Sequence, residues 1–210
     1  MQLPFSLVST SQVKEDLPIV DGSLFFWSHF LDEHEADECL RVLVAETPWR
    51  QDTLRFGGKA VPIPRLQAWY GEKDSLYGYS GLALPPLPWT PRLLQLKTRI
   101  EDAAEVTFNS VLINYYRDGQ DSVSWHSDDE TELGDNPVIA SLSLGVTRRF
   151  ELKHRHKKVQ KVTCDLCHGS LLIMGPGVQA HWQHQIPKQP EIVDGRINLT
   201  FRAIKPSHQD

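Results

Sequence analysis

Two segments of the chain place apolar residues at helical spacing, and each has recognisable ends. The first spans residues 32–46 and stops before Pro48, which cannot continue a helix. The second begins at Thr90-Pro91, where threonine can cap a helix and proline suits its first position, and it runs to about Ala104. The apolar residues that carry the period are Ala36, Cys39, Leu40, Leu43, Leu93, Leu94, Leu96 and Ile100. The sequence therefore predicts two amphipathic helices.

After Val106 the pattern changes to short apolar or alternating runs separated by Gly, Asp, Asn and Pro. These candidate strands span residues 110–117, 122–125, 138–146, 149–154, 159–166, 170–174, 181–186 and 196–204. About eight short strands of this kind predict a jelly roll, also called a double-stranded β-helix. The predicted fold class is thus mostly β with flanking helices.

The segment ahead of the second helix carries weaker signals. Residues 49–65 suggest a hairpin around Gly57-Gly58, and residues 66–70 suggest a further strand. Residues 77–88 are interrupted by Pro and Gly and predict a loop rich in aromatic residues.

The chain shows no internal repeat and no flexible linker, so we predict a single domain over residues 1–210. Within it, residues 1–105 form an N-terminal extension and residues 106–204 the jelly-roll core. The first thirty residues have no clear period, and we expect residues 1–18 to be partly disordered.

Composition limits the class of protein. Apolar residues make up 40% of the chain and charged residues 23%, which is enough for a real core. No signal peptide and no apolar run long enough to span a bilayer is evident, so we expect a cytoplasmic protein without a membrane partner. Three cysteines do not make a disulfide framework, which fits a reducing compartment. No obligate protein partner is evident.

The formal net charge of -5 means that contact with a polyanion needs a local basic patch. One stretch is dense in cationic residues, and a solvated hairpin tip is the commoner explanation for such a run. Its members are Arg148, Arg149, Lys153, His154, Arg155, His156, Lys157, Lys158 and Lys161.

His126, Asp128 and a distant His184 are candidate metal ligands. Residues two apart on a strand point to the same face, so His126 and Asp128 can bind one ion together. Two histidines and one carboxylate form the facial triad of non-haem Fe(II) oxygenases. An isolated His-x-Asp is weak, because it can equally be part of an exposed acidic loop, and Asp129 and Glu130 follow directly.

The C-terminal run Arg-Ile-Asn-Leu-Thr-Phe-Arg (196–202) alternates strictly between polar and apolar residues. Its polar face must line something wet or charged, because the apolar face belongs on the core. Arg196 and Arg202 lie roughly 20 Å apart along a strand, and their side chains can reach the two ends of a dicarboxylate. Asn114 and Tyr116 can form the matching wall. Two unrelated arginines on an edge strand are the alternative, and the polar Asn198 and Thr200 on the same face make it the weaker one.

Together these segments resemble the AlkB family of Fe(II)- and 2-oxoglutarate-dependent dioxygenases, which reverse alkylation damage in DNA and RNA. The resemblance runs in order from about residue 68 to 204, whereas the first fifty residues match little. The segments that carry it are Val-Leu-Ile-Asn-Tyr-Tyr-Arg-Asp-Gly (111–119), Trp-His-Ser-Asp-Asp-Glu (125–130), Ala-Ser-Leu-Ser-Leu-Gly (140–145), His-Gly-Ser-Leu-Leu-Ile-Met (168–174), Trp-Gln-His (182–184) and residues 196–202.

The resemblance implies specific roles in an oxidative demethylase. The enzyme would use Fe(II), 2-oxoglutarate and O2 to hydroxylate an N-methyl group of 1-methyladenine or 3-methylcytosine and release formaldehyde. Iron would lie on His126, Asp128 and His184. The residues that bind 2-oxoglutarate would be Arg196 and Tyr116 at the far carboxylate, with Asn114, Asn198 and Arg202 completing the pocket.

Other residues would bind the alkylated nucleic acid. The resemblance implies DNA as the substrate and leaves RNA open, with the N-terminal hairpins as a nucleotide-recognition lid. Tyr79 would stack on the flipped base opposite His126, although a packed loop aromatic is a competing interpretation. Tyr77 and Glu130 would contact the base or the backbone. Phe56 would be a wedge between bases or, equally, ordinary hairpin packing. With this context we favour phosphate contact for the basic stretch.

Alternatives remain at this stage. Cys164-Asp-Leu-Cys167-His168 formally matches a haem-attachment pattern, but it lies in a strand-like run without an export signal, and buried strand cysteines explain it better. The same oxygenase core can act on protein or on RNA methyl marks. A third alternative is a non-catalytic module that binds nucleic acid.

Overall fold

The structure is a computed structural model that describes residues 13–205 except 57–58, 74–76, 80–81 and 85; the side chains of residues 54–56, 77–79 and 82–84 lie outside the description too. Two antiparallel sheets make up most of it. In spatial order, the seven-stranded sheet contains β1 (Glu15–Asp16), β2 (Leu24–Trp27), β13 (Leu171–Met174), β10 (Ile139–Gly145), β15 (Arg196–Arg202), β8 (Ser110–Tyr116) and β5 (Leu66–Gly71). The four-stranded sheet contains β12 (Val162–Leu166), β11 (Arg148–His154), β14 (Trp182–Ile186) and β9 (Val123–His126).

The jelly roll predicted from the strand pattern is confirmed. All eight predicted strands after residue 106 are present, with ends shifted by a few residues. The strand predicted over residues 66–70 is confirmed as β5, and the N-terminal segment contributes more sheet than expected, because β1 and β2 extend the other edge of the large sheet. Within the segment expected to be partly disordered, residues 15–16 form β1, and residues 1–12 lie outside the described part.

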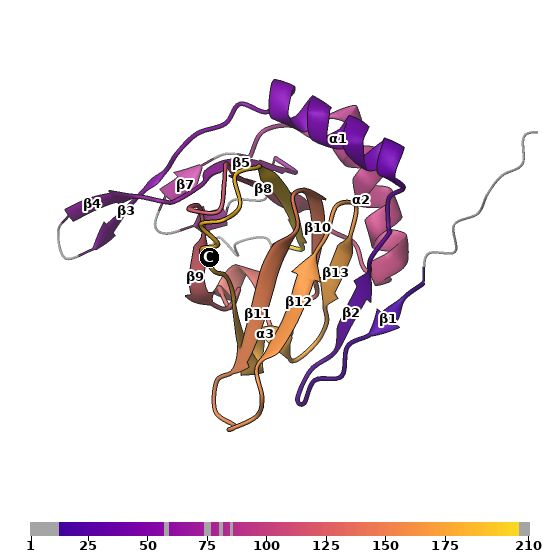
Figure 1. The fold of residues 1–210 in the computed structure, drawn as a ribbon, viewed down its shortest axis with the longest axis vertical. Helices are drawn as coiled ribbons and strands as arrows, with labels where there is room; N and C mark the ends of the chain where they lie inside the picture. Colours follow the sequence, from indigo (N-terminus) through magenta and orange to yellow (C-terminus); the bar gives the residue numbers. More distant parts are fainter. Residues whose placement is uncertain (1–12, 57–58, 74–76, 80–81, 85, 206–210) are drawn as a thin grey trace, which may run out of the picture.

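Two small hairpins precede the core. β3 (Thr53–Phe56) and β4 (Lys59–Pro62) form the predicted hairpin, which projects away from the two sheets in Figure 1. β6 (Tyr77–Tyr79) and β7 (Leu82–Leu84) pair as well, so the prediction of a plain loop over 77–88 is wrong there. A short run with Pro and Gly on either side carries too few residues to show the strand period.

Both predicted helices are present and are capped by side chains. α1 (Glu33–Glu46) begins at Asp32, whose carboxylate accepts a 2.8 Å hydrogen bond from the Glu35 amide. α2 (Pro91–Ala104) begins at Thr90, whose hydroxyl accepts a hydrogen bond from the Leu93 amide at 3.2 Å. In each case a polar side chain satisfies an amide that the first helical turn leaves free.

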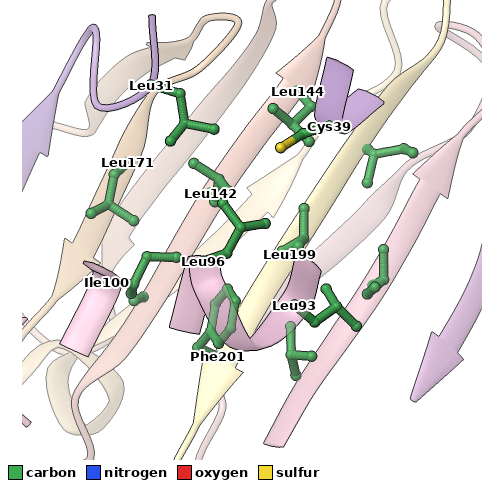
Figure 2. Packing of buried hydrophobic residues seen from close by; sticks show 14 of the residues in the cluster. Leu31, Cys39, Leu93, Leu96, Ile100, Leu142, Leu144, Leu171, Leu199 and Phe201 are labelled. Atoms are coloured by element: carbon green, nitrogen blue, oxygen red, sulfur yellow. The ribbon is translucent and has the colours of Figure 1, made fainter. Parts of the chain in front are cut away.

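The helices cover the outer face of the large sheet (Figure 1). Figure 2 shows Leu96 and Ile100 of α2 close to Leu142 and Phe201 of the sheet. A second apolar cluster, which includes Phe150 and Leu172, lies between the two sheets. Because residues alternate along β15, its apolar side chains face the helices, and its polar side chains face the space between the sheets.

Candidate active site

Two neighbouring strands of the small sheet bring the candidate histidines together. His126 is the last residue of β9, and it pairs in register with His184 in the middle of β14. The centroids of the two imidazole rings lie 4.3 Å apart. The ligand atoms of both histidines and of Asp128 all lie within 4.8 Å of one another. The predicted ligand set is therefore assembled by the fold.

Asp128 does not lie on a strand, so the expectation that it shares a strand face with His126 is wrong. β9 ends at His126, and the backbone amide of Asp128 instead donates to the Gln179 side chain at 3.0 Å. The turn places Asp128 Oδ1 at 3.7 Å from His126 Nε2. Gln179, which is fully buried in the short helix α3 (Val178–His181), therefore positions the carboxylate.

Hydrogen bonds leave the ligand atoms available. His126 Nδ1 lies 2.8 Å from the Ser124 carbonyl oxygen, so it donates there and leaves Nε2 with a lone pair. The other oxygen of the carboxylate, Asp128 Oδ2, accepts from Arg202 Nη2 at 2.7 Å and from Nε at 3.2 Å. The buried Nδ1 of His184 has no hydrogen-bond partner among the described residues. One carboxylate oxygen and two imidazole nitrogens form a donor set that suits Fe(II).

The protonation states of two ligands suit the same role. Burial by itself would raise the pKa of Asp128, but the Arg202 guanidinium and the two imidazoles outweigh burial and lower that pKa to about 2. Burial, together with His126, lowers the pKa of His184 to about 3. At neutral pH the site therefore holds an ionised carboxylate beside a neutral imidazole, the forms that bind metal.

Arg202 corrects the predicted two-ended clamp. Its side chain lies in the wall of the cavity, but the guanidinium binds Asp128 in a buried ion pair. Arg196 and Arg202 lie at opposite ends of β15, so one is at the metal-ligand end and the other is far from it. The predicted positions of the two arginines on one strand are confirmed. Alternation along a strand, however, cannot show which partner each arginine binds.

Arg196 is a buried cation without a carboxylate partner. It is 1% exposed, and Nη2 donates to the Ser143 hydroxyl at 2.9 Å. Its Nε and Nη1 have no hydrogen-bond partner, and it forms no ion pair within the described part of the chain. Burial lowers the pKa of Arg196 to about 10, so it still carries its charge at neutral pH. A buried charge of this kind calls for an anion.

The two asparagines lie in the same cavity, as predicted, and each is held by neighbours. Asn198 Nδ2 donates to the Ser141 hydroxyl at 2.7 Å, and its Oδ1 accepts from Thr200 at 2.9 Å. Asn114 Oδ1 accepts from Arg65 Nε at 2.8 Å. Arg65, 5% exposed, lines the cavity and was missed by the sequence reasoning, because nothing in the run before β5 marks it as buried.

These residues share one cavity between the two sheets. It has about 540 Å³ of empty space, part of which is open to solvent. The His–Asp–His ligands lie in its wall together with the cationic Arg196. The other lining residues are Arg65, Leu112, Asn114, Tyr116, Val123, Ser141, Phe150, Leu166, Met174, Ile186, Asn198, Thr200 and Arg202. The donors and the cation in its wall thus suit a metal ion together with a small anionic molecule.

The candidate substrate residues are placed only in part. Glu130 precedes the 3-10 turn η1 (Thr131–Leu133), and its buried Oε2 has no hydrogen-bond partner among the described residues. Phe56 ends β3, and Tyr77 and Tyr79 lie on β6, but their side chains are outside the described part. Their predicted contacts with a base therefore stay predictions.

The basic stretch is smaller than the sequence suggested. Arg148 is fully buried and donates to the backbone carbonyls of Asp118, Asp121 and Pro187, so it is not part of a phosphate-binding surface. The imidazole of His154 is 1% exposed and is excluded as well. The exposed members are Arg149, Arg155, His156, Lys157, Lys158 and Lys161.

Two other groups of potential metal ligands are better explained as structure. All three cysteines are free, and burial raises the pKa of Cys164 to about 12, which disfavours a thiolate ligand. Asp21, His154 and His181 also cluster. His154 Nδ1, however, accepts hydrogen bonds from two backbone amides, so the proton is on Nε2, which donates to Asp21 at 3.0 Å. That nitrogen has no lone pair for a metal.

Two facing antiparallel sheets with a His–Asp–His donor set between them define the class of jelly-roll, non-haem Fe(II) oxygenases. Residues 23–202 match the model of the 2OG-Fe(II) oxygenase superfamily. The chain is 47% identical over 186 residues to alpha-ketoglutarate-dependent dioxygenase alkB homolog 3 of Mus musculus (84% of this chain, 64% of that protein). It is 39% identical over 183 residues to DNA oxidative demethylase ALKBH2 of Mus musculus (82% of this chain, 77% of that protein). The chain belongs to the AlkB family of this superfamily.

Solved structures agree on the fold. That of OsALKBH1 superposes with a TM-score of 0.63 at 18% identity, over 90% of this chain and all of that one. An oxidoreductase of the 2OG-Fe(II) oxygenase family from Burkholderia pseudomallei gives a TM-score of 0.57 at 14% identity, over 85% and 84% of the two chains. The chain spans less than two thirds of the length of the alkB homolog 3 proteins it matches. Among the described residues, no helix is long and apolar enough to cross a membrane.

Proposed function

We propose that this protein is an Fe(II)- and 2-oxoglutarate-dependent dioxygenase that removes alkyl groups from N-alkylated bases such as 1-methyladenine and 3-methylcytosine. The observation that carries the proposal is the unpaired, fully buried Arg196, which shares a cavity with the His–Asp–His donor set. The guanidinium of Arg196 can bind one carboxylate of a 2-oxo dicarboxylate. A metal held by the His–Asp–His donor set can bind the 2-oxo acid at the other end of the same molecule.

In this proposal His126, Asp128 and His184 hold the ferrous ion and leave three coordination positions open. When bound, the iron supplies oxidation of a C–H bond by O2, coupled to conversion of 2-oxoglutarate to succinate and CO2. Arg202 keeps Asp128 ionised and binds its Oδ2, so Oδ1 is the oxygen that would be left for a metal. Gln179 fixes the backbone of Asp128 by accepting a hydrogen bond from its amide.

Arg196 is proposed to bind the distal carboxylate of 2-oxoglutarate through Nε and Nη1, the two donors left without partners. The ring of Tyr116 lies 5.3 Å from the Arg196 guanidinium carbon, so its hydroxyl is placed to help. Asn114 and Asn198 form the side wall, and their orientation is set by Arg65 and Thr200. The two sheets enclose the cavity on the side of Asp128 and His184, whose side chains are buried, and it opens to solvent beside His126.

The alkylated base must leave its stack to reach this cavity, which takes a few kcal/mol in duplex DNA and less in a single strand. His126, the most exposed of the three ligands, faces the open side. We propose Tyr79, Tyr77 and Glu130 as base contacts and the exposed basic residues of 149–161 as phosphate contacts. Phe56, on the projecting hairpin, is proposed as the duplex wedge.

Two less specific assignments accompany this proposal. Residues 1–105 would act as the substrate-recognition lid and residues 106–204 as the catalytic core, although β2 and β5 of the first segment also complete the large sheet. A cytoplasmic location is proposed with them, since all three cysteines are free thiols.

The test is release of formaldehyde and succinate from a 1-methyladenine oligonucleotide with Fe(II), ascorbate and 2-oxoglutarate. Asp128→Asn and Arg196→Ala should abolish both products. Asp129→Asn is the matched control, because Asp129 is exposed and directly follows the metal ligand Asp128 in the chain. Among the described residues its ion pair is with the exposed Arg155, at 3.0 Å. It should retain nearly full activity.

Each other result has a definite meaning. Consumption of 2-oxoglutarate without formaldehyde from the oligonucleotide would reject the base substrate and favour a related oxygenase that acts on protein or on other RNA methyl marks. Metal binding without any consumption of 2-oxoglutarate would reject the enzyme and favour a nucleic-acid-binding module. Parallel assays on single-stranded DNA, duplex DNA and RNA rank the substrates, and Phe56→Ala should reduce activity on the duplex most.

A further inference from the structure

Arg148 is a second fully buried cation near the proposed 2-oxoglutarate site, and the proposed mechanism does not use it. It is the first residue of β11, in the small sheet. Its guanidinium donates to the carbonyl oxygens of Asp118 at 3.0 Å, Asp121 at 2.9 Å and Pro187 at 2.8 Å. Among the described residues it forms no ion pair, since the Asp121 carboxylate binds Arg117 instead. Its charge is therefore solvated mainly by neutral carbonyl dipoles, and the carboxylates of Asp118, Asp121 and Glu191 stabilise it without direct contact.

Arg148 and Arg196 approach the same aromatic ring from different sheets. The guanidinium carbon of Arg148 lies 5.7 Å from the centroid of the Tyr116 ring, and that of Arg196 lies 5.3 Å from it. Arg196 and Tyr116 are direct register partners on β15 and β8. Two buried guanidinium groups that flank one phenol repel each other, and among the described residues neither is in direct contact with a carboxylate. An anion bound beside Tyr116 would relieve this repulsion.

The hydrogen bonds of Arg148 also explain how it is held there. It ties the segment that follows β8, at Asp118 and Asp121, to the segment that follows β14, at Pro187. The first segment leads into β9 with His126, and the second leaves β14 with His184. Arg148 thus joins the two connections that border the Arg196 end of the cavity.

We infer that Arg148 is a positioning and electrostatic residue for the distal carboxylate of the co-substrate. It does not line the cavity; it acts through Tyr116 and through its positive charge, and so favours a dicarboxylate over a monocarboxylate of the same length. The inference rests on the proposed binding of 2-oxoglutarate by Arg196. It adds that selectivity for the second carboxylate depends on two arginines, one of which makes no contact with the ligand.

Binding to the Mn(II)-loaded protein tests this without turnover. Isothermal titration calorimetry gives Kd for 2-oxoglutarate and for 2-oxopentanoate, which lacks the distal carboxylate. Arg148→Gln keeps donors for the carbonyls but removes the charge. It should weaken 2-oxoglutarate on the order of tenfold, as one nearby unit charge does in a partly buried site. It should change 2-oxopentanoate by less than about twofold. In turnover, KM for 2-oxoglutarate should rise more than kcat falls.

Lys188→Gln is the matched control, because Lys188 is exposed, directly follows Pro187 in the chain, and should leave both affinities unchanged. Arg148→Lys keeps the charge and should retain the preference for the dicarboxylate. If Arg148→Gln does not fold, loss of this preference in Arg148→Lys would overturn the inference. Equal weakening of both ligands in either variant would show a purely structural role and overturn the inference. If wild type shows no preference, or if Arg196→Gln leaves the preference intact, the proposed co-substrate site fails first.

Discussion

Removing Arg202 tests how the candidate metal site is held together before any metal binds. Arg202 and Asp128 form an ion pair at 2.7 Å, and their side chains are 5% and 4% exposed. We predict that Arg202→Met destabilises the metal-free protein by about 3–5 kcal/mol, because it leaves a buried carboxylate without its main partner. The pKa of Asp128 should then rise above its ordinary value, since burial is no longer outweighed.

The magnitude has a lower bound from the ionisation of Asp128. Its pKa is about 2 in the folded protein, against an ordinary 3.8. That difference corresponds to about 2 kcal/mol in favour of the folded state at neutral pH. Because the folded pKa is the lower one, this contribution is complete above pH 4 and is lost as the pH falls from about 4 towards 2. Removal of Arg202 abolishes most of it and adds the penalty of the unpaired charge.

The assay is urea unfolding at pH 7 with a chelator present, on wild type, Arg202→Met, Asp128→Asn and the double variant. The losses in the free energy of unfolding of the two single variants should not add in the double variant, because it has no unpaired buried charge at either position. The coupling energy should reach about 2 kcal/mol or more. Arg117→Met is the control: Arg117 also binds a buried aspartate, Asp121, but its side chain is 44% exposed, so the expected loss is about 1 kcal/mol or less. A loss for Arg202→Met no larger than for Arg117→Met would refute the reasoning.

Three further predictions address the ligands and the core. The pKa of His184 is lowered to about 3, so the metal-free protein should lose stability as the pH falls from 6.5 towards 3. In urea unfolding at pH 5.5 and 7.5, His184→Gln should reduce this change in the free energy of unfolding. An equal change in wild type and variant would contradict the prediction. Gln179→Leu removes the acceptor for the Asp128 amide and should weaken Mn(II) binding by about 10-fold or more in calorimetric titration, whereas unchanged affinity would mean that the loop holds itself. Phe201→Ala, at the helix–sheet contact in Figure 2, should lower the free energy of unfolding by about 3–5 kcal/mol, and a loss below 1 kcal/mol would show that this core relaxes around a void.

Local rules explain why much of the fold was readable in advance. The caps Asp32 and Thr90 begin their helices where the sequence indicated, because the capping groups lie within three residues of the amides that they satisfy. The strands after residue 106 were found from turn residues and alternation, which are also local signals. β2 was missed because a strand of four residues, Leu24–Trp27, is defined by its pairing with β13 and not by any period of its own.

Candidate ligands were found by residue type, but their relations were not. His126, Asp128 and His184 were named from spacing and chemistry, although Asp128 turned out to lie beyond the strand. Arg65 gave no signal, because only the packed sheets show that its side chain is buried against Asn114. The substrate residues Phe56, Tyr77 and Tyr79 stay predictions.

The sequence by itself determined the two helices and the strands after residue 106, which residues can bind a metal, and that β15 has one polar and one apolar face. Only the tertiary structure decided what each charged side chain meets. Arg148, Arg196 and Arg202 are the same residue type, but the fold gives each a different partner. Arg148 donates to backbone carbonyls, Arg196 has donors left for an anion, and Arg202 pairs with Asp128. The partner of a buried charge comes from strands far away in the chain, and its energy depends on distance and burial, which no local pattern encodes.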